Sequence, residues 1–134
     1  MKTTVLDSYA VITYLQRQPG YEEVARIFEE CATKDREALM CVINWGEVIF
    51  HALRTGGDQK ATLAEDAMRA IPITVEHEVS KELTLQAARF KAFHKLSYAD
   101  CFAAALAVKK KCELVTGDKE FKNVEKEVKI RWIK

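Results

Sequence analysis

Residues 98–118 read YADCFAAALAVKKKCELVTGD, and this stretch decides the fold class. Tyr98 to Lys111 predicts a helix whose residues from Cys101 to Val108 are all apolar. A helix that is apolar nearly all round is buried in the centre of a domain. The next residues, Glu113 to Thr116, predict a short strand that ends in a turn. A buried helix that is followed directly by a strand indicates an α/β fold.

The rest of the chain alternates strand and helix signals in the same way. Strands are predicted over residues 3–6, 38–42, 71–75, 113–116 and 128–133, the last as an edge strand. Helices are predicted over residues 8–15, 22–32, 44–54, 59–70, 79–93 and 98–111, with Ser8 as an N-cap and Gly56-Gly57 as a stop. This alternation predicts a three-layer α/β/α sandwich with a mostly parallel sheet, as a single domain over residues 1–134.

Composition limits the classes of protein that the chain can belong to. With 134 residues, 49% hydrophobic and 31% charged, it fits one globular domain. No apolar run reaches the ~18 residues of a membrane span, and the N-terminus meets Asp7 too early for a signal peptide, so we expect a cytosolic protein without a membrane partner. The four cysteines lack metal-site spacing, which favours buried free thiols, although a disulfide stays open.

The net charge of +1 excludes a polycation. Residues 1–67 carry 7 basic against 11 acidic side chains, and residues 68–134 carry 14 against 9. This asymmetry permits a basic face beside an acidic pocket, and it is equally typical of ordinary solvated surfaces.

Four acidic residues lie at the predicted strand ends. Asp7 follows the first strand, and Asp118 comes two residues after Thr116. Glu47 and Asp100 are expected in the first turns of the helices after the second strand and after Leu96-Ser97. Because ligands bind at the carboxyl ends of parallel strands, these carboxylates should converge on one crevice. Each also has a structural explanation, as a helix cap, a turn residue or a partner of the helix dipole.

Carboxylates held together repel one another unless a cation neutralises them. Hard oxygen ligands select Mg²⁺ or Mn²⁺ over softer metals. A Mg²⁺ ion bound by carboxylates keeps some waters and accepts phosphate oxygens as further ligands, which is the chemistry of phosphodiester hydrolysis. The pattern therefore indicates a metal site that acts on a phosphodiester.

The acids and their neighbours resemble the four motifs of PIN domains, especially VapC-type toxins. The order is the same, and the matching segments are Val5-Leu6-Asp7-Ser8, Asn44-Trp45-Gly46-Glu47-Val48, Leu96 to Ala107, and Leu114 to Phe121. The first motif departs from the common pattern at Tyr9, where the family often has Asn or Ser. The resemblance implies an α/β/α fold, Mg²⁺- or Mn²⁺-dependent ribonuclease activity on RNA, a homodimer and a cognate antitoxin.

The resemblance also assigns roles by position. Asp7, Glu47, Asp100 and Asp118 become catalytic metal-binding acids, and Ser8 and Thr116 match hydroxyl positions that support the site. Lys119 lies just beyond Asp118, where it is placed to contact a phosphate backbone or to remain a solvated surface residue. These seven residues form the predicted site.

Other classes with strand-end acids fit less well. A signalling receiver domain needs a phosphoacceptor Asp after a central strand, and Val75-Glu76 supplies none. A haloacid-dehalogenase phosphatase needs Asp-x-Asp, which Asp7-Ser8-Tyr9 does not provide. A PIN-like domain that binds RNA or protein without cutting, and a housekeeping RNA-processing nuclease, remain as alternatives to a toxin.

Overall fold

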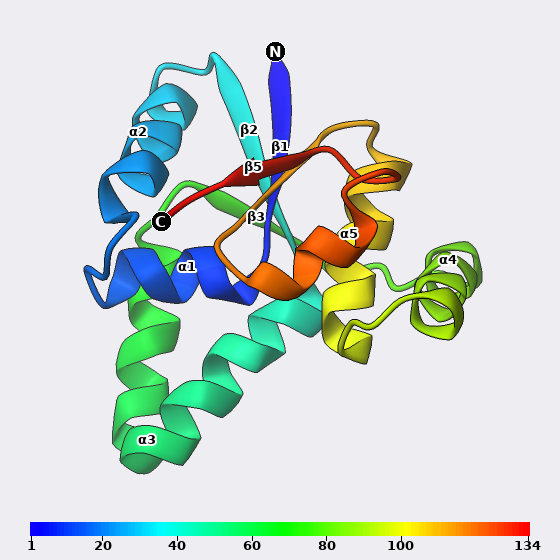
Figure 1. Ribbon diagram of the computed structural model, residues 1–134. Coiled ribbons are helices and arrows are strands. Elements are labelled where there is room, and N and C mark those ends of the chain that lie inside the picture. The colour runs from blue at the N-terminus through cyan, green and yellow to red at the C-terminus, as the bar shows by residue number, and fades with distance from the viewer.

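Five parallel strands form the centre of the protein, in the spatial order β3-β2-β1-β4-β5 (Figure 1). The computed structural model describes residues 1–134. The strands are β1 (Lys2–Leu6), β2 (Arg36–Cys41), β3 (Ile73–Glu76), β4 (Glu113–Thr116) and β5 (Ile130–Trp132). The predicted parallel sheet is confirmed, and the last strand does lie at an edge.

Five α-helices and one 3₁₀-helix connect and cover these strands (Figure 1). They are α1 (Ser8–Leu15), α2 (Tyr21–Ala32), α3 (Val42–Arg69), α4 (Lys81–Phe93), α5 (Tyr98–Lys109) and the 3₁₀-helix η1 (Lys119–Val124). The helix η1 was not predicted, because the turn signal at Gly117-Asp118 hid the short helix that follows it. No helix combines the length and the apolar composition that crossing a bilayer requires.

Two separate apolar cores, one on each face of the sheet, establish the three-layer sandwich. Side chains alternate along a strand, so Val5 packs with α4 and α5 while Leu6 packs with α1, α2 and α3. On β4, Leu114 belongs to the same core as Val5, and Val115 belongs to the same core as Leu6. The predicted α/β/α architecture is therefore confirmed.

The apolar helix predicted from residues 98–111 is α5, and it is buried as expected. Every residue from Cys101 to Ala107 is buried, and Val108 is the first exposed one. The four alanines among these residues let α5 pack closely against both α4 and the sheet. This packing fixes the N-terminus of α5, and with it Asp100, against the carboxyl ends of the strands.

Helix α3 differs from the prediction of two helices separated at Gly56-Gly57. It runs from Val42 to Arg69 and bends at Gly57, which has φ 70° and ψ −164°. Only glycine adopts that backbone conformation at little cost, so the residue marks a sharp bend in the path of the helix. The two arms of α3 lie at an angle to each other below α1 in Figure 1.

Two local predictions near the strand ends were wrong. Asp7, not Ser8, is the N-cap of α1, because its Oδ1 accepts a hydrogen bond from the Ala10 N–H at 2.9 Å. Glu47 lies in the second turn of α3, because that helix begins at Val42, earlier than the predicted start. The four cysteines are free thiols, two of them buried and two half-buried.

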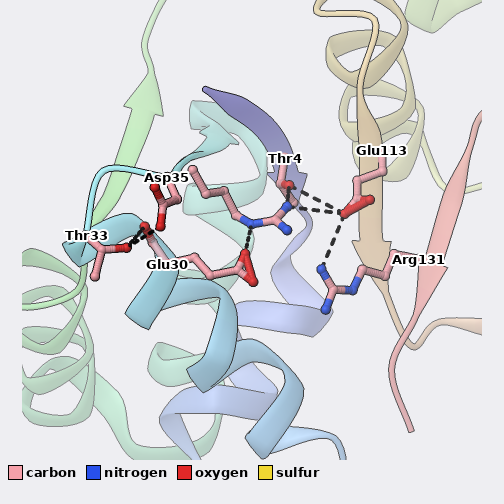
Figure 2. Close-up of polar contacts among 7 residues, drawn as sticks. Thr4, Glu30, Thr33, Asp35, Glu113 and Arg131 are labelled. Atoms are coloured by element: carbon pink, nitrogen blue, oxygen red, sulfur yellow. Dashed lines mark hydrogen bonds and ion pairs between the residues drawn. The ribbon is translucent and has the colours of Figure 1, made fainter.

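A buried polar network closes the opposite end of the sheet. Arg36 and Glu113 are the first residues of β2 and β4, and Arg36 donates to Thr4 and lies 3.5 Å from the Glu113 carboxylate. Figure 2 shows Glu113 between Thr4 and Arg131, and the Arg131 guanidinium lies 3.6 Å from the carboxylate. Arg36 also pairs with Glu30 of α2 at 2.8 Å. The charges at this end therefore neutralise one another, unlike those at the other end.

Candidate active site

Strands β1 and β4 are neighbours, so the residues that follow them meet at one edge of the sheet. Leu6 pairs with Val115, and the Asp7 N–H donates to the Val115 carbonyl at 3.4 Å. The Thr116 hydroxyl donates to Asp7 Oδ2 at 2.5 Å and accepts from the Asp118 N–H at 3.0 Å. One buried hydroxyl therefore links Asp7 to Asp118, the first and the last of the four predicted acids.

Asp7 is the deepest of the acids, with 1% of its surface exposed. Burial is the main cause that raises the pKa of its carboxyl to about 8; the hydrogen bonds from Thr116 and Ala10 oppose the rise, and the nearby Asp100 and Asp118 charges add to it. A carboxyl with this pKa holds its proton near neutral pH unless a cation compensates the charge.

Asp100 lies in the first turn of α5 and is also buried. The Ser97 hydroxyl caps the helix by accepting from the Asp100 N–H at 3.2 Å, which fixes the backbone at this position. Burial, followed by repulsion from Asp118 and Glu47, raises the pKa of Asp100 to about 7. These causes place Asp118 and Glu47 close enough to Asp100 to oppose its ionisation.

Asp118 and Glu120 come from the start of η1. Asp118 is the N-cap of this helix, and its Oδ1 accepts from the Glu120 N–H at 3.0 Å. One carboxylate oxygen each from Asp100, Asp118 and Glu120 lie within 4.8 Å of one another. This separation suits three oxygens that share a single cation.

Glu47 faces this cluster from α3. Its Oε1 accepts hydrogen bonds from the Ser8 hydroxyl at 2.9 Å and from Asn44 Nδ2 at 3.0 Å. The side chain is half-buried, so it remains in contact with the solvent-filled part of the crevice. Glu47 thus joins α1 and α3 to the acidic cluster.

An open pocket of about 400 Å³ lies over these acids. Its walls come from α1, α3, η1 and the start of α5, and its lining includes the acids Glu47, Asp100, Asp118 and Glu120. Asp7 lies beneath the pocket and does not line it.

The three carboxylates that lie closest together offer oxygen donors, the ligand type that hard divalent cations prefer. Asp100, Asp118 and Glu120 are placed to hold such an ion, with Asp7 below them and Glu47 beside them. Carboxylates crowded against each other without a countercharge destabilise the fold, so the donor set fits a metal better than a structural role alone.

A family model for the PIN domain matches residues 4–127, which is nearly the whole chain. The chain belongs to the PIN domain family. The family match confirms the resemblance that the motifs indicated. The comparison with curated protein sequences found no match.

Solved structures that share the fold of this PIN domain include proteins of toxin–antitoxin systems. VapBC2 from Rickettsia felis, bound to a promoter DNA fragment, is 13% identical, with a TM-score of 0.77 over 98% of this chain and 99% of that one. VapBC-1 from nontypeable Haemophilus influenzae is 16% identical, with a TM-score of 0.69 over 97% of both chains. VapC20 from Mycobacterium tuberculosis, a sarcin-ricin-loop-cleaving toxin, is 20% identical, with a TM-score of 0.68 over 89% and 92%.

The structure of this PIN domain brings most, but not all, of the predicted site residues together. The four predicted acids, with Ser8 and Thr116, gather at the crevice, whereas Lys119 is exposed and does not line the pocket. Sequence reasoning missed Glu120, although an acid two residues beyond Asp118 was visible. It also missed Asn44, whose signal was a polar residue one turn before Glu47.

Proposed function

We propose that this PIN domain is a Mg²⁺- or Mn²⁺-dependent endoribonuclease that acts in the cytosol as the toxin of a type II toxin–antitoxin pair. The observation that carries the proposal is the set of carboxylate oxygens of Asp100, Asp118 and Glu120 within 4.8 Å of one another. The family match and the toxin–antitoxin identity of the similar structures support it.

The proposed chemistry is hydrolysis of an RNA phosphodiester. A bound divalent cation supplies charge neutralisation and lowers the pKa of its water. Asp100, Asp118 and Glu120 hold that charge at the floor of the pocket, and Asp7 adds a further negative charge from below. Glu47, on the other wall, orients the attacking water and accepts its proton.

Because water is the proposed nucleophile, the chemical ends of the two products follow from the mechanism. We expect 5′-phosphate and 3′-hydroxyl ends, and a 2′-deoxy substitution at the cleaved nucleotide should leave the chemical step intact. Asp100→Asn should lower the rate by about 10²-fold or more, as the loss of an electrostatic element of a transition state does. The assay uses purified protein, Mn²⁺, a panel of structured RNAs and analysis of the product ends.

The matched control is Asp66→Asn, which removes an exposed acid that pairs with Arg69 on α3, and it should cleave like the wild type. Cleavage that survives EDTA, or products with 2′,3′-cyclic phosphates, would contradict the proposed mechanism. An inert wild type over the whole panel would favour a PIN domain that binds RNA or protein without cutting.

An apolar groove beside the acidic pocket supports an antitoxin partner. This groove of about 290 Å³ lies between α1 and the two arms of α3, and it is lined by Ile12, Leu15, Val48, Ala52 and Leu63 among others. It shares Ile12, Gln16 and His51 with the acidic pocket. A protein segment seated in the groove would therefore reach the mouth of the pocket and block it.

Leu63 offers a direct test, because 62% of its surface is exposed although it lines the groove. Leu63→Asp should release the product of the adjacent antitoxin-like reading frame from a co-purified complex. Phe93→Asp, at an apolar residue of α4 that is 72% exposed, should leave that complex intact. Loss of the partner from both variants, or from neither, would contradict the groove as its site. The absence of such a reading frame would favour a housekeeping nuclease.

The homodimer is part of the same proposal. Leu85 and Phe93 are exposed on α4, away from both the groove and the acids, and they offer an apolar surface for a second copy. Light scattering should give the mass of two chains for the wild type and of one chain for Phe93→Asp. A monomeric wild type would contradict this part of the proposal.

A further inference from the structure

Asn44 occupies an unusual position beside the acids. It lies in the first turn of α3 and is fully buried. Its Nδ2 donates to Glu47 Oε1 at 3.0 Å and to the Ala99 carbonyl at 3.0 Å. Both hydrogens of the side-chain amide are therefore used, one within α3 and one across to α5.

The chemistry of the two partners fixes the orientation of this amide. A carboxylate and a backbone carbonyl are both acceptors, so the NH₂ group and not the oxygen must face them. The Asn44 Oδ1 is left buried without a hydrogen-bond partner. An unpaired buried oxygen opposes stability, so fold stability alone does not explain an amide at this position.

The second partner is informative because Ala99 directly precedes Asp100. As a residue of α5, Ala99 already directs its carbonyl at the helical N–H four residues on, so the bond from Asn44 is additional to the helix. That bond links Asn44, which also contacts Glu47, to the turn of α5 that carries Asp100. The separation between these two acids is thereby held by one side chain.

The bonds to Glu47 also distinguish its two oxygens. Ser8 and Asn44 both donate to Oε1, and no group of the protein donates to Oε2. Since Oε1 is occupied by two donors, Oε2 is the oxygen left to interact with a cation or its water.

We propose that Asn44 is a positioning residue that sets Glu47, through Oε1, and its distance to Asp100 for binding of the divalent cation. This inference rests on the proposed metal-dependent function and extends it. It assigns Asn44 no contact with substrate. Its effect on the cation is exerted through Glu47.

The test measures Mn²⁺ affinity, from the loss of the electron paramagnetic resonance signal of free Mn²⁺, in wild type, Asn44→Leu, Glu47→Gln and the double variant. Asn44→Leu is similar in size and should bind Mn²⁺ about 10- to 100-fold more weakly, the usual effect of removing a partner that orients a ligand. In the Glu47→Gln background the same substitution should cause no further loss, because the residue that Asn44 positions is already altered.

Asn123→Leu is the matched control. Asn123 also donates from Nδ2 to a backbone carbonyl, that of Lys95, at 3.0 Å, but it is exposed and lies outside the pocket. Its replacement should leave Mn²⁺ affinity unchanged. In thermal unfolding without metal, Asn44→Leu should be as stable as the wild type. If the Asn44→Leu variant does not fold, Asn44→Ala, which adds no bulk, is used in its place.

Equal Mn²⁺ affinity in Asn44→Leu and wild type would overturn the proposal, as would additive losses in the double variant or no Mn²⁺ binding by the wild type. Because these readouts require no RNA, an inactive wild type that shows the expected Mn²⁺ losses would overturn the ribonuclease proposal and support the role of Asn44.

Discussion

Replacing Asp7 by Asn should make the metal-free protein less sensitive to rising pH. Folding raises the pKa of this carboxyl from 3.8 to about 8, mainly through burial. Between these pH values the folded protein keeps a proton that the unfolded chain has released, so the stability of the wild type falls by about 1.36 kcal/mol per pH unit. Across the whole window the loss is on the order of 5 kcal/mol, which approaches the total stability of many domains.

The asparagine side chain has no proton to lose and can still cap α1 through its carbonyl oxygen. The measurement is urea unfolding in EDTA from about pH 4 to about pH 8, the window given by the two pKa values. The free energy of unfolding of the variant should equal that of the wild type at the acidic end of this window and should exceed it by more as the pH rises. Asp66→Asn, at an exposed acid, should run parallel to the wild type. Parallel curves for Asp7→Asn would refute the assignment of a raised pKa to Asp7.

Three further predictions concern the metal, the polar network and the bend of α3. Mn²⁺ at about 100 times its Kd should stabilise the wild type by about 2.7 kcal/mol in thermal unfolding, and a rise of equal size in Asp100→Asn would exclude this site. Arg36→Met should cost about 3–5 kcal/mol in urea unfolding, because the buried Glu113 keeps only Arg131 as a charged partner, and a cost below about 1 kcal/mol would refute a role for the pair. Gly57→Ala should cost about 1 kcal/mol through its positive φ, whereas Gly46→Ala, inside the same helix with equally open surroundings, should stabilise the protein by about 0.5–1 kcal/mol; equal effects would contradict a strained bend.

The layers of the fold were predictable because burial leaves a clear periodic signal. The run from Cys101 to Ala107 has no polar face, so it had to lie inside, and the strands beside it had to be covered on both sides. The break at Gly57 was also visible, but whether a glycine ends a helix or bends it depends on the contacts of both arms. Sequence patterns do not contain those contacts.

The candidate site was predictable only in part, for a related reason. The topology brings Asp7, Asp100 and Asp118 to one edge, and strand-end positions reveal this. The start of α3 at Val42 placed Glu47 a turn later than expected, because no capping side chain marks that helix start. The bond from Asn44 to Ala99 spans 55 residues and leaves no local pattern, so only the folded structure reveals it.

The shared hydroxyl of Thr116 has a consequence for the order of events during synthesis. It bonds to Asp7 across 109 residues of sequence, and β1 has β4 as one of its two neighbours in the sheet. During synthesis the N-terminal part of a chain emerges first, but a contact between residues far apart in sequence can form only after the later residue has been made. Until β4 has left the ribosome, Asp7 lacks the Thr116 hydroxyl as a donor, and the cluster of Asp100, Asp118 and Glu120 does not exist. The growing chain therefore carries no complete acidic centre until Glu120 has been made.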